Sequence, residues 1–168
     1  STKPSAPRWL RSTRGNQRVS LSWLRPRTSG GASITSYVIE ASTDDGLTWN
    51  DVTGSLSKSR ARSVSGLVNG TKYRFRVAAV NRAGRGAWSS VSSARPLSVP
   101  SAPLDVAGEE VDRAVRLTWT APAQTGGTAI TSYEVQRSSN GGVTWTKVSS
   151  SSPLLNRRTA SGLLNVST

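Results

Sequence analysis

The stretch GLVNGTKYRFRVAAVN, residues 66–81, decides the fold of this chain. From residue 73 to residue 79, aromatic or aliphatic side chains alternate with Arg74, Arg76 and a small alanine. Successive side chains of a β-strand point to opposite faces, so this period predicts a strand with one buried face and one solvated face. The Asn-Gly pair just before it is typical of a tight turn. The stretch therefore predicts one half-buried strand of an antiparallel sheet.

Two earlier segments show the same period of two, around Val19-Ser20-Leu21-Ser22-Trp23 and Tyr37-Val38-Ile39-Glu40-Ala41. Turn-forming residues separate the apolar runs, at residues 14–16, 29–31, 44–46, 69–70 and 82–84. No segment carries a helical apolar stripe with a capping residue. Short strands at this spacing, within a unit of about 95 residues, are typical of a β-sandwich, so we expect an all-β fold.

An internal repeat organises the chain. Pro4-Ser5-Ala6-Pro7 returns as Pro100-Ser101-Ala102-Pro103, an offset of 96 residues. Aligning residues 4–72 with residues 100–168 gives 25 identities in 69 pairs, with no gap. We therefore predict a tandem duplication with a first unit at residues 1–96, a linker at 97–99 and a second unit at 100–168.

These residues resemble the fibronectin type III domain. The likeness rests on the Pro-Ser-Ala-Pro entry, on Trp23 followed by Pro26, on Gly-Gly before Ile34-Thr35-Ser36-Tyr37, and on residues 66–81. The resemblance implies two tandem Ig-like sandwiches, and a tyrosine corner made by Tyr73 with the loop around Leu67. The structural hallmark residues that it implies are Trp23, Tyr37, Leu67 and Tyr73 in the first unit and Trp119, Tyr133 and Leu163 in the second.

The second unit has no sequence that matches residues 73–96. By the resemblance, it lacks the last two strands of the family, which leaves an open edge and half a core. Two explanations follow. The chain is a segment of a longer protein, or a partner donates strands that complete the second unit.

Composition argues against catalysis. The chain contains no His, no Cys and no Met, which removes the usual general base, the thiol nucleophile and the common soft metal ligands. The pairs Asp44-Asp45 and Glu109-Glu110 are sequence neighbours, whereas glycoside hydrolysis needs two carboxyls facing each other across a cleft. We expect no enzyme, no cofactor and no metal site within these residues. No apolar run reaches about 18 residues, so we expect no membrane insertion.

The segment Ser42-Thr43-Asp44-Asp45-Gly46-Leu47-Thr48-Trp49 resembles the Asp-box turn of sialidase propellers. A functional interpretation is carbohydrate handling, and a structural one is a β-hairpin turn. The repeat carries Asn140 where the first unit has Asp44, which keeps the hydrogen bonding of a turn but loses the charge. The structural interpretation is therefore favoured.

Charge is the clearest functional signal, because the net charge of +13 is unevenly distributed. Residues 1–99 hold 16 Lys and Arg against 4 Asp and Glu, whereas residues 100–168 hold 6 against 5. We predict contact of the first unit with an acidic polymer or partner, the alternative being a merely solvated basic surface. The candidate contact residues are Arg8, Arg11, Arg14, Arg18, Arg74, Arg76 and Trp88.

Three functions are consistent with these observations. The first is a non-catalytic structural or adhesive module that belongs to a bacterial extracellular protein or to a phage tail or capsid-decorating protein. The second is an accessory domain of a secreted polysaccharide-degrading enzyme, and the third is a polyanion-binding module. The expected partners are other protein subunits, a cell-wall or virion surface, an acidic polymer and a donated strand. The expected location is extracellular, at a cell surface or in a virion.

Overall fold

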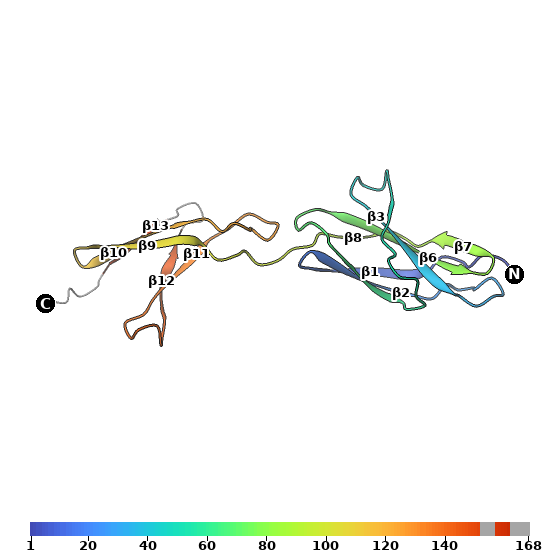
Figure 1. Ribbon diagram of the computed structural model, residues 1–168, viewed down its shortest axis with the longest axis horizontal. Coiled ribbons are helices and arrows are strands. Elements are labelled where there is room, and N and C mark those ends of the chain that lie inside the picture. The colour runs from blue at the N-terminus through green and yellow to red at the C-terminus, as the bar shows by residue number, and fades with distance from the viewer. Residues whose placement is uncertain (152–156, 162–168) are drawn as a thin grey trace. The chain divides into compact units, whose positions relative to one another are not determined.

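The computed structural model describes residues 1–151 and 157–161, which form thirteen strands and no helix (Figure 1). The chain divides into two compact units, residues 1–98 and 99–168. The strands of unit one are β1 (Arg8–Gly15), β2 (Arg18–Leu24), β3 (Ser36–Ser42), β4 (Asn50–Asp51), β5 (Ala61–Ser65), β6 (Tyr73–Asn81), β7 (Gly84–Trp88) and β8 (Ser92–Ala94). Those of unit two are β9 (Leu104–Val111), β10 (Ala114–Thr120), β11 (Tyr133–Arg137), β12 (Thr146–Ser151) and β13 (Arg157–Ser161).

Unit one is a sandwich of two antiparallel sheets. One sheet has the order β1-β2-β5, and the other has the order β4-β3-β6-β7 with β8 also paired to β6. Strand β6, predicted from its alternating sequence, lies in the middle of the second sheet and pairs with β3 from Ser36↔Val80 to Ser42↔Arg74. The prediction of an all-β sandwich is confirmed.

The core of unit one lies between the inner faces of these sheets. The apolar positions of each alternating strand point inward, and Phe75 and Val77 of β6 are completely buried. Trp23 of β2 meets Tyr37 of β3 edge to face, with ring centroids 5.3 Å apart. Tyr73 stacks on Phe75, and its hydroxyl accepts a hydrogen bond from the Val68 N–H at 3.0 Å, next to buried Leu67. Burial of the apolar side chains on these two inner faces is the main favourable contribution to the free energy that holds the sheets together.

Unit two contains a three-stranded sheet, β13-β10-β9, and a two-stranded sheet, β11-β12. Strands β9, β10 and β13 begin and end 96 residues after β1, β2 and β5. The aromatic pair is repeated as well, since Trp119 meets Tyr133 with ring centroids 5.2 Å apart. Leu163 lies outside the described residues, and the absence of the last two strands from unit two stays a prediction.

The described residues offer no helix that is long and apolar enough to cross a membrane. They also contain no cluster of three or more His, Cys, Asp or Glu side chains placed to hold a metal ion.

Candidate interaction surfaces

The structure distributes the predicted contact residues over both sheets of unit one. Four of the arginines belong to the sheet β1-β2-β5, two belong to β6 of the other sheet, and Trp88 ends β7. They do not form one basic patch. The two sheet surfaces are therefore separate candidates, and each has its own geometry.

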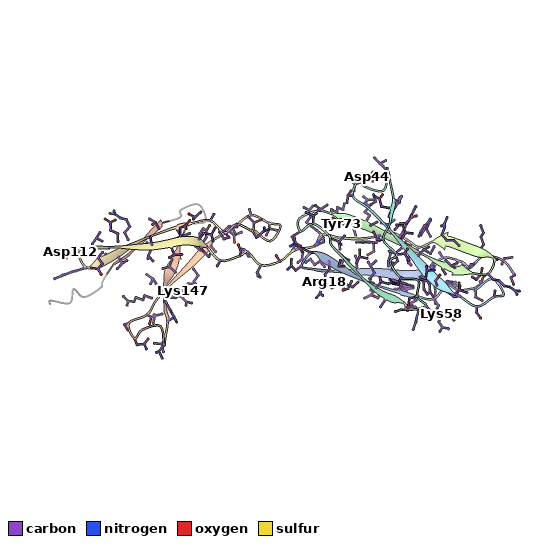
Figure 2. The ribbon with its side chains drawn as sticks, viewed as in Figure 1. Arg18, Asp44, Lys58, Tyr73, Asp112 and Lys147 are labelled. Atoms are coloured by element: carbon purple, nitrogen blue, oxygen red, sulfur yellow. The ribbon has the colours of Figure 1, made fainter. Side chains whose placement is uncertain are left out.

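The sheet β1-β2-β5 presents three unpaired cations. Arg11, Arg14 and Arg18 are exposed, and no hydrogen bond or ion pair joins their side chains to another described residue (Figure 2 labels Arg18). Arg8 differs, because it is partly buried and its Nε donates to the main-chain oxygen of Arg25 at 3.2 Å. Three of the four predicted arginines on this sheet thus have guanidinium groups available to a partner.

Trp9 lies on the same sheet, at a β-bulge between Arg8 and Arg11. Its side chain is 68% exposed, and its backbone has φ 58°, in the left-handed region that bulky side chains rarely adopt. The equivalent residue of unit two, Asp105, has φ 51°. Aspartate tolerates this conformation because its short polar side chain bonds locally, whereas tryptophan has no such compensation. The fold needs a left-handed residue here, but it does not need a tryptophan.

The outer face of the other sheet carries a ladder of stacked side chains. The Arg76 guanidinium lies 4.2 Å from the Trp49 ring centroid and 4.5 Å from that of Trp88, and Arg85 stacks on Trp88 at 4.5 Å. Arg76 Nε also donates to Glu40 Oε2 at 2.8 Å, because β3 and β6 place these two residues opposite each other. The sequence predicted Arg76 and Trp88 as contact residues but gave no sign of their partners, Trp49, Arg85 and Glu40.

Arg74, the second predicted cation of β6, is also paired within the protein. Its Nη2 lies 2.9 Å from Asp45 Oδ1, and Lys72 Nζ lies 3.5 Å from the same oxygen. The Arg74 and Arg76 charges are therefore offset by Asp45 and Glu40. This makes the β6 surface weaker than the β1-β2-β5 surface as a binding site for an acidic partner.

The Asp-box-like turn is closed on itself. Asp44 Oδ1 accepts from the Thr48 N–H at 2.9 Å and from the Ser42 hydroxyl at 2.6 Å, and Trp49 Nε1 donates to the Gly46 oxygen at 3.0 Å. Hydrogen bonds, first from Ser42 and then from Thr48, hold the pKa of Asp44 well below its usual range.

The repeat of this turn keeps the same pattern with an amide in place of the carboxylate. Asn140 Oδ1 accepts from the Thr144 N–H at 2.9 Å, and Trp145 Nε1 donates to the Gly142 oxygen at 3.1 Å. Since the bonds form with or without a charge, the geometry supports a structural turn rather than a carbohydrate site.

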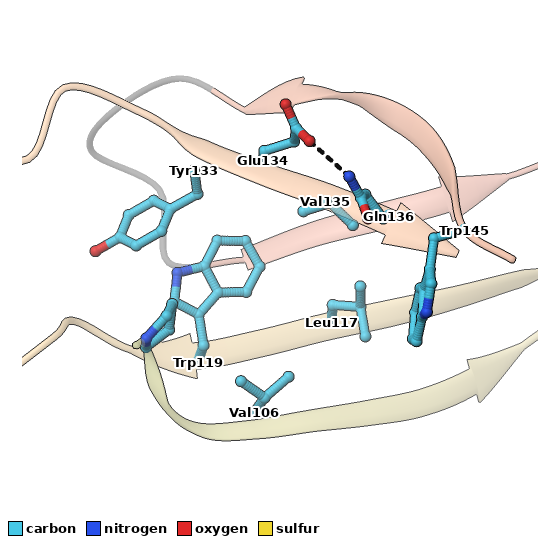
Figure 3. Close-up of a pocket in the computed structure, with 9 residues that line it drawn as sticks. Val106, Leu117, Trp119, Tyr133, Glu134, Val135, Gln136 and Trp145 are labelled. Carbon is cyan, nitrogen blue, oxygen red and sulfur yellow. Dashed lines mark hydrogen bonds between the residues drawn. The ribbon is translucent and has the colours of Figure 1, made fainter. Parts of the chain in front are cut away.

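Unit two contains an apolar hollow of about 320 Å³ (Figure 3). Leu117, Trp119, Tyr133 and Val135 line it, and Trp145 closes one side. In unit one, the residues at the matching positions share a core cluster with Phe75 and Val77 of β6. The hollow therefore corresponds to the space that β6 side chains fill in unit one.

The fibronectin type III domain family matches residues 5–95, which include both sheets of unit one. The chain belongs to the fibronectin type III family. The tandem arrangement of two such domains stays a prediction, because the matched residues end at 95.

The curated relatives of this fibronectin type III chain are animal proteins. Titin of Drosophila melanogaster is 31% identical over 153 residues, which cover 87% of this chain and 1% of titin. Human myomesin-2 is 32% identical over 70% of this chain and 8% of its own length. Mouse cardiac-type myosin-binding protein C is 28% identical over 85% of this chain and 11% of its own length. This chain thus spans only a small part of each relative.

Two solved structures agree with the fold. A crystal structure of titin domains has a TM-score of 0.52 and 28% identity, over 55% of this chain and 32% of that chain. The structure of the chicken CNTN1 FN1-FN3 domains has a TM-score of 0.53 and 25% identity, over 93% of this chain and 55% of that chain. The predicted bacterial or phage origin is corrected by these comparisons, because the curated relatives come from animals. The prediction followed the local Gly-Gly and Asp-Gly-x-Thr-Trp sequences, which turn geometry alone explains.

Proposed function

We propose that this chain is a non-catalytic interaction module of a longer protein, and that unit one contacts an acidic partner protein through the surface of β1-β2-β5. One relative is named as a myosin-binding protein, which supports a protein partner. A location outside the cell or at its surface is a further prediction from the sequence.

The observation that carries the proposal is Trp9. An exposed tryptophan in a left-handed backbone is unfavourable for folding on two counts, its conformation and its solvation. Tryptophan is also among the residues most enriched where protein interfaces are strongest. Its position at one end of a sheet that carries three unpaired arginines farther along β1 and β2 supports a contact that combines an apolar anchor with cationic groups.

Charge complementarity indicates the chemistry of the partner. Arg11, Arg14 and Arg18 add three positive charges to this surface with no acidic partner among the described residues. Arginine pairs with carboxylates through two parallel hydrogen bonds, and such charges accelerate encounter with an acidic surface. An acidic protein segment is therefore the partner that this surface fits best.

The test measures binding of the full chain to purified myosin and to poly-L-glutamate, by fluorescence anisotropy at low and physiological salt. We expect saturable binding that weakens as salt rises, since the Debye screening length falls from about 30 Å at 0.01 M salt to about 8 Å at physiological salt. Trp9→Asp, which copies position 105, is expected to weaken binding about tenfold or more, as is usual for a central aromatic anchor.

Leu47→Ser is the matched control, because Leu47 is exposed on unit one but lies in the turn between β3 and β4. It is expected to leave binding unchanged. Absence of binding to both probes at low salt contradicts the interaction role. Equal binding by Trp9→Asp and the parent chain contradicts the assigned surface. Tighter binding of duplex DNA than of poly-L-glutamate, measured in the same way, favours the alternative of a nucleic-acid-binding module.

A second candidate function concerns unit two, where the hollow favours acceptance of a β-strand from a partner. Its lining residues are those that pack against β6 in unit one, so an alternating apolar strand fits the space. Added strands gain affinity from main-chain hydrogen bonds and specificity from alternate side-chain pockets.

A peptide copying residues 73–81 tests this second candidate on the full chain. We expect it to slow hydrogen exchange at the amides of β11, whereas a peptide of the same composition with Phe75 and Val77 exchanged for Arg74 and Arg76 does not. Unchanged exchange with both peptides contradicts strand acceptance.

A further inference from the structure

A second cavity, of about 380 Å³, lies in unit one and was not identified from the sequence. It is formed by the connection between β2 and β3, by Tyr37 of β3, and by the connection between β4 and β5. Its lining residues are Arg25, Pro26, Ser29, Ser33, Ile34, Tyr37 and Lys58. In Figure 2, Lys58 lies toward the N-terminus of unit one and Arg18 toward the opposite end, so this cavity is separate from Arg18.

The cations around this cavity have no internal partner. No hydrogen bond or ion pair joins the Arg25 or Lys58 side chain to another described residue, and the same holds for Arg60 nearby. Arg25 and Arg60 act electrostatically on the Tyr37 hydroxyl and oppose the effect of burial, which raises the pKa of Tyr37. Unpaired cations thus face a cavity that also presents hydroxyl groups.

The loop that carries Arg25, Ser29 and Ser33 is held in place. Buried Asn81 donates from Nδ2 to the main-chain oxygens of Ser29 and Thr2, both at 2.7 Å. Gly30 has φ 73°, and a Cβ there would lie 2.0 Å from the Thr2 oxygen, so the N-terminal segment is packed directly on the loop. A loop fixed in this way loses little entropy when a ligand binds, which favours a preformed site.

Unit two contains a cavity at the matching position, and it provides an internal comparison. Pro122, Ile130 and Tyr133 line it as Pro26, Ile34 and Tyr37 line the first. The sequence, however, replaces Arg25 by Ala121 and Ser33 by Ala129. The apolar floor therefore belongs to the fold, and hydroxyl groups also line the unit-two cavity at Thr128 and Thr131, whereas the Arg25 cation is particular to unit one.

We propose that the cavity at Arg25, Lys58 and Tyr37 binds a phosphoryl group. A phosphate monoester carries close to two negative charges and three acceptor oxygens, which match two lining cations and the hydroxyls of Ser29, Ser33 and Tyr37. A carboxylate has one charge and two oxygens, and it leaves more of these donors unused. Pro26 and Ile34 add an apolar wall that suits the carbon atoms of a phosphorylated side chain. The site does not depend on the proposed function, because it uses different residues.

The test is an NMR titration of the full chain with inorganic phosphate and, separately, with an N-acetyl phosphoserine amide. We expect saturable shifts at the amides of Ser29, Ser33 and Tyr37, and tighter binding of the phosphoserine compound. Arg25→Ala, which copies position 121, is expected to weaken binding about tenfold, as for loss of one charge-assisted hydrogen-bond partner. Lys58→Ala is a second, exposed variant that tests the site without altering the loop.

Arg137→Ala is the matched control, because it removes the same charge from an exposed position of β11 in unit two. It is expected to leave the phosphoserine affinity unchanged. Equal weakening by Arg137→Ala and Arg25→Ala shows a general charge effect and overturns the proposal, as does the absence of saturable shifts. Stronger binding of inorganic phosphate than of the phosphoserine compound rejects the phosphorylated side chain and leaves a free-phosphate site.

Discussion

Unit one and unit two share the boundaries of three strands and several turn conformations but present different side chains to solvent. The bulge residue has a left-handed backbone in both units, but it is Trp9 in unit one and Asp105 in unit two. The Asp-box-like turn has Asp44 in unit one and Asn140 in unit two. The cavity cation Arg25 becomes Ala121. Where the backbone stays and the side chain changes, the fold cannot be the reason for the side chain. The difference therefore separates residues that make the sandwich from residues available for binding.

The two units also differ in how their cores are closed. In unit one, β6 supplies fully buried Phe75 and Val77, whereas the described residues of unit two line a hollow at the corresponding place.

Phe75→Ala is expected to lower the free energy of unfolding of unit one by about 3–5 kcal/mol, because it leaves a cavity in a close-packed core. Val135→Ala in unit two is expected to cost less, because valine buries less apolar surface than phenylalanine and because Val135 lines a hollow rather than a filled core. Urea unfolding, monitored by hydrogen exchange at the amides of β2 for unit one and β10 for unit two, measures both losses of stability in the same sample. Equal losses in the two units contradict the described difference between their cores.

Asn81→Ala is expected to destabilise unit one by about 1–2 kcal/mol, because it removes two partly buried hydrogen bonds to the main-chain oxygens of Thr2 and Ser29. Asn81 is only 3% exposed and holds the loop at Ser29. Faster hydrogen exchange at residues 28–31 with unchanged exchange in unit two is the expected signature. Arg82→Ala, an exposed neighbour, serves as the control and is expected to have little effect.

Arg76→Ala is expected to cost unit one about 1–2 kcal/mol through loss of its contacts with Trp49 and Trp88. Arg76→Lys tests the stacking, since an ammonium keeps the charge but lacks the planar group. Glu40→Gln is expected to cost about 0–1 kcal/mol, with a salt dependence that is typical of partly exposed ion pairs. Thermal unfolding at low and high salt distinguishes the loss of stacking from the loss of the ion pair. If the unfolding temperature of Arg76→Lys equals that of the parent protein, stacking of the guanidinium does not contribute to stability.

Asp44→Asn is expected to have the smallest effect at neutral pH, because Asn140 shows that an amide closes the same turn. The pKa of Asp44 is lower in the folded state than in the unfolded state, where it is near 3.9. The ionised Asp44 carboxylate therefore stabilises the fold at pH values above about 3.9, and this stabilisation is lost as the pH falls from there toward the folded-state pKa. The variant is therefore expected to make unit one less sensitive to acid. The acid sensitivity that remains is attributed to Asp51, whose pKa is lowered by a hydrogen bond from the Thr53 N–H.

The reciprocal swap, Asn140→Asp, is expected to add acid sensitivity to unit two below about pH 4, in addition to that of Glu134, whose pKa is lowered by Lys147. Unfolding measured between pH 2 and pH 7 tests both variants. Unchanged pH profiles in both contradict the assigned role of the carboxylate.

Local sequence was sufficient for the strands and the core. Alternation at residues 73–79 correctly placed Phe75 and Val77 inside and Arg74 and Arg76 outside, because the two-residue period of a strand is a property of its own backbone. The offset of 96 residues also relates backbone conformations that recur in the structure, such as those of Trp9 and Asp105.

Only the tertiary structure decided which charges are free. Arg76 and Arg18 look alike in the sequence, yet strand pairing brings Glu40 opposite Arg76 and leaves Arg18 unpaired. The cavity brings Lys58 and Arg25 together from two connections that are distant along the chain. Such contacts depend on strand order and register, which arise from many non-local interactions, whereas each strand's inner and outer faces follow from its own residues.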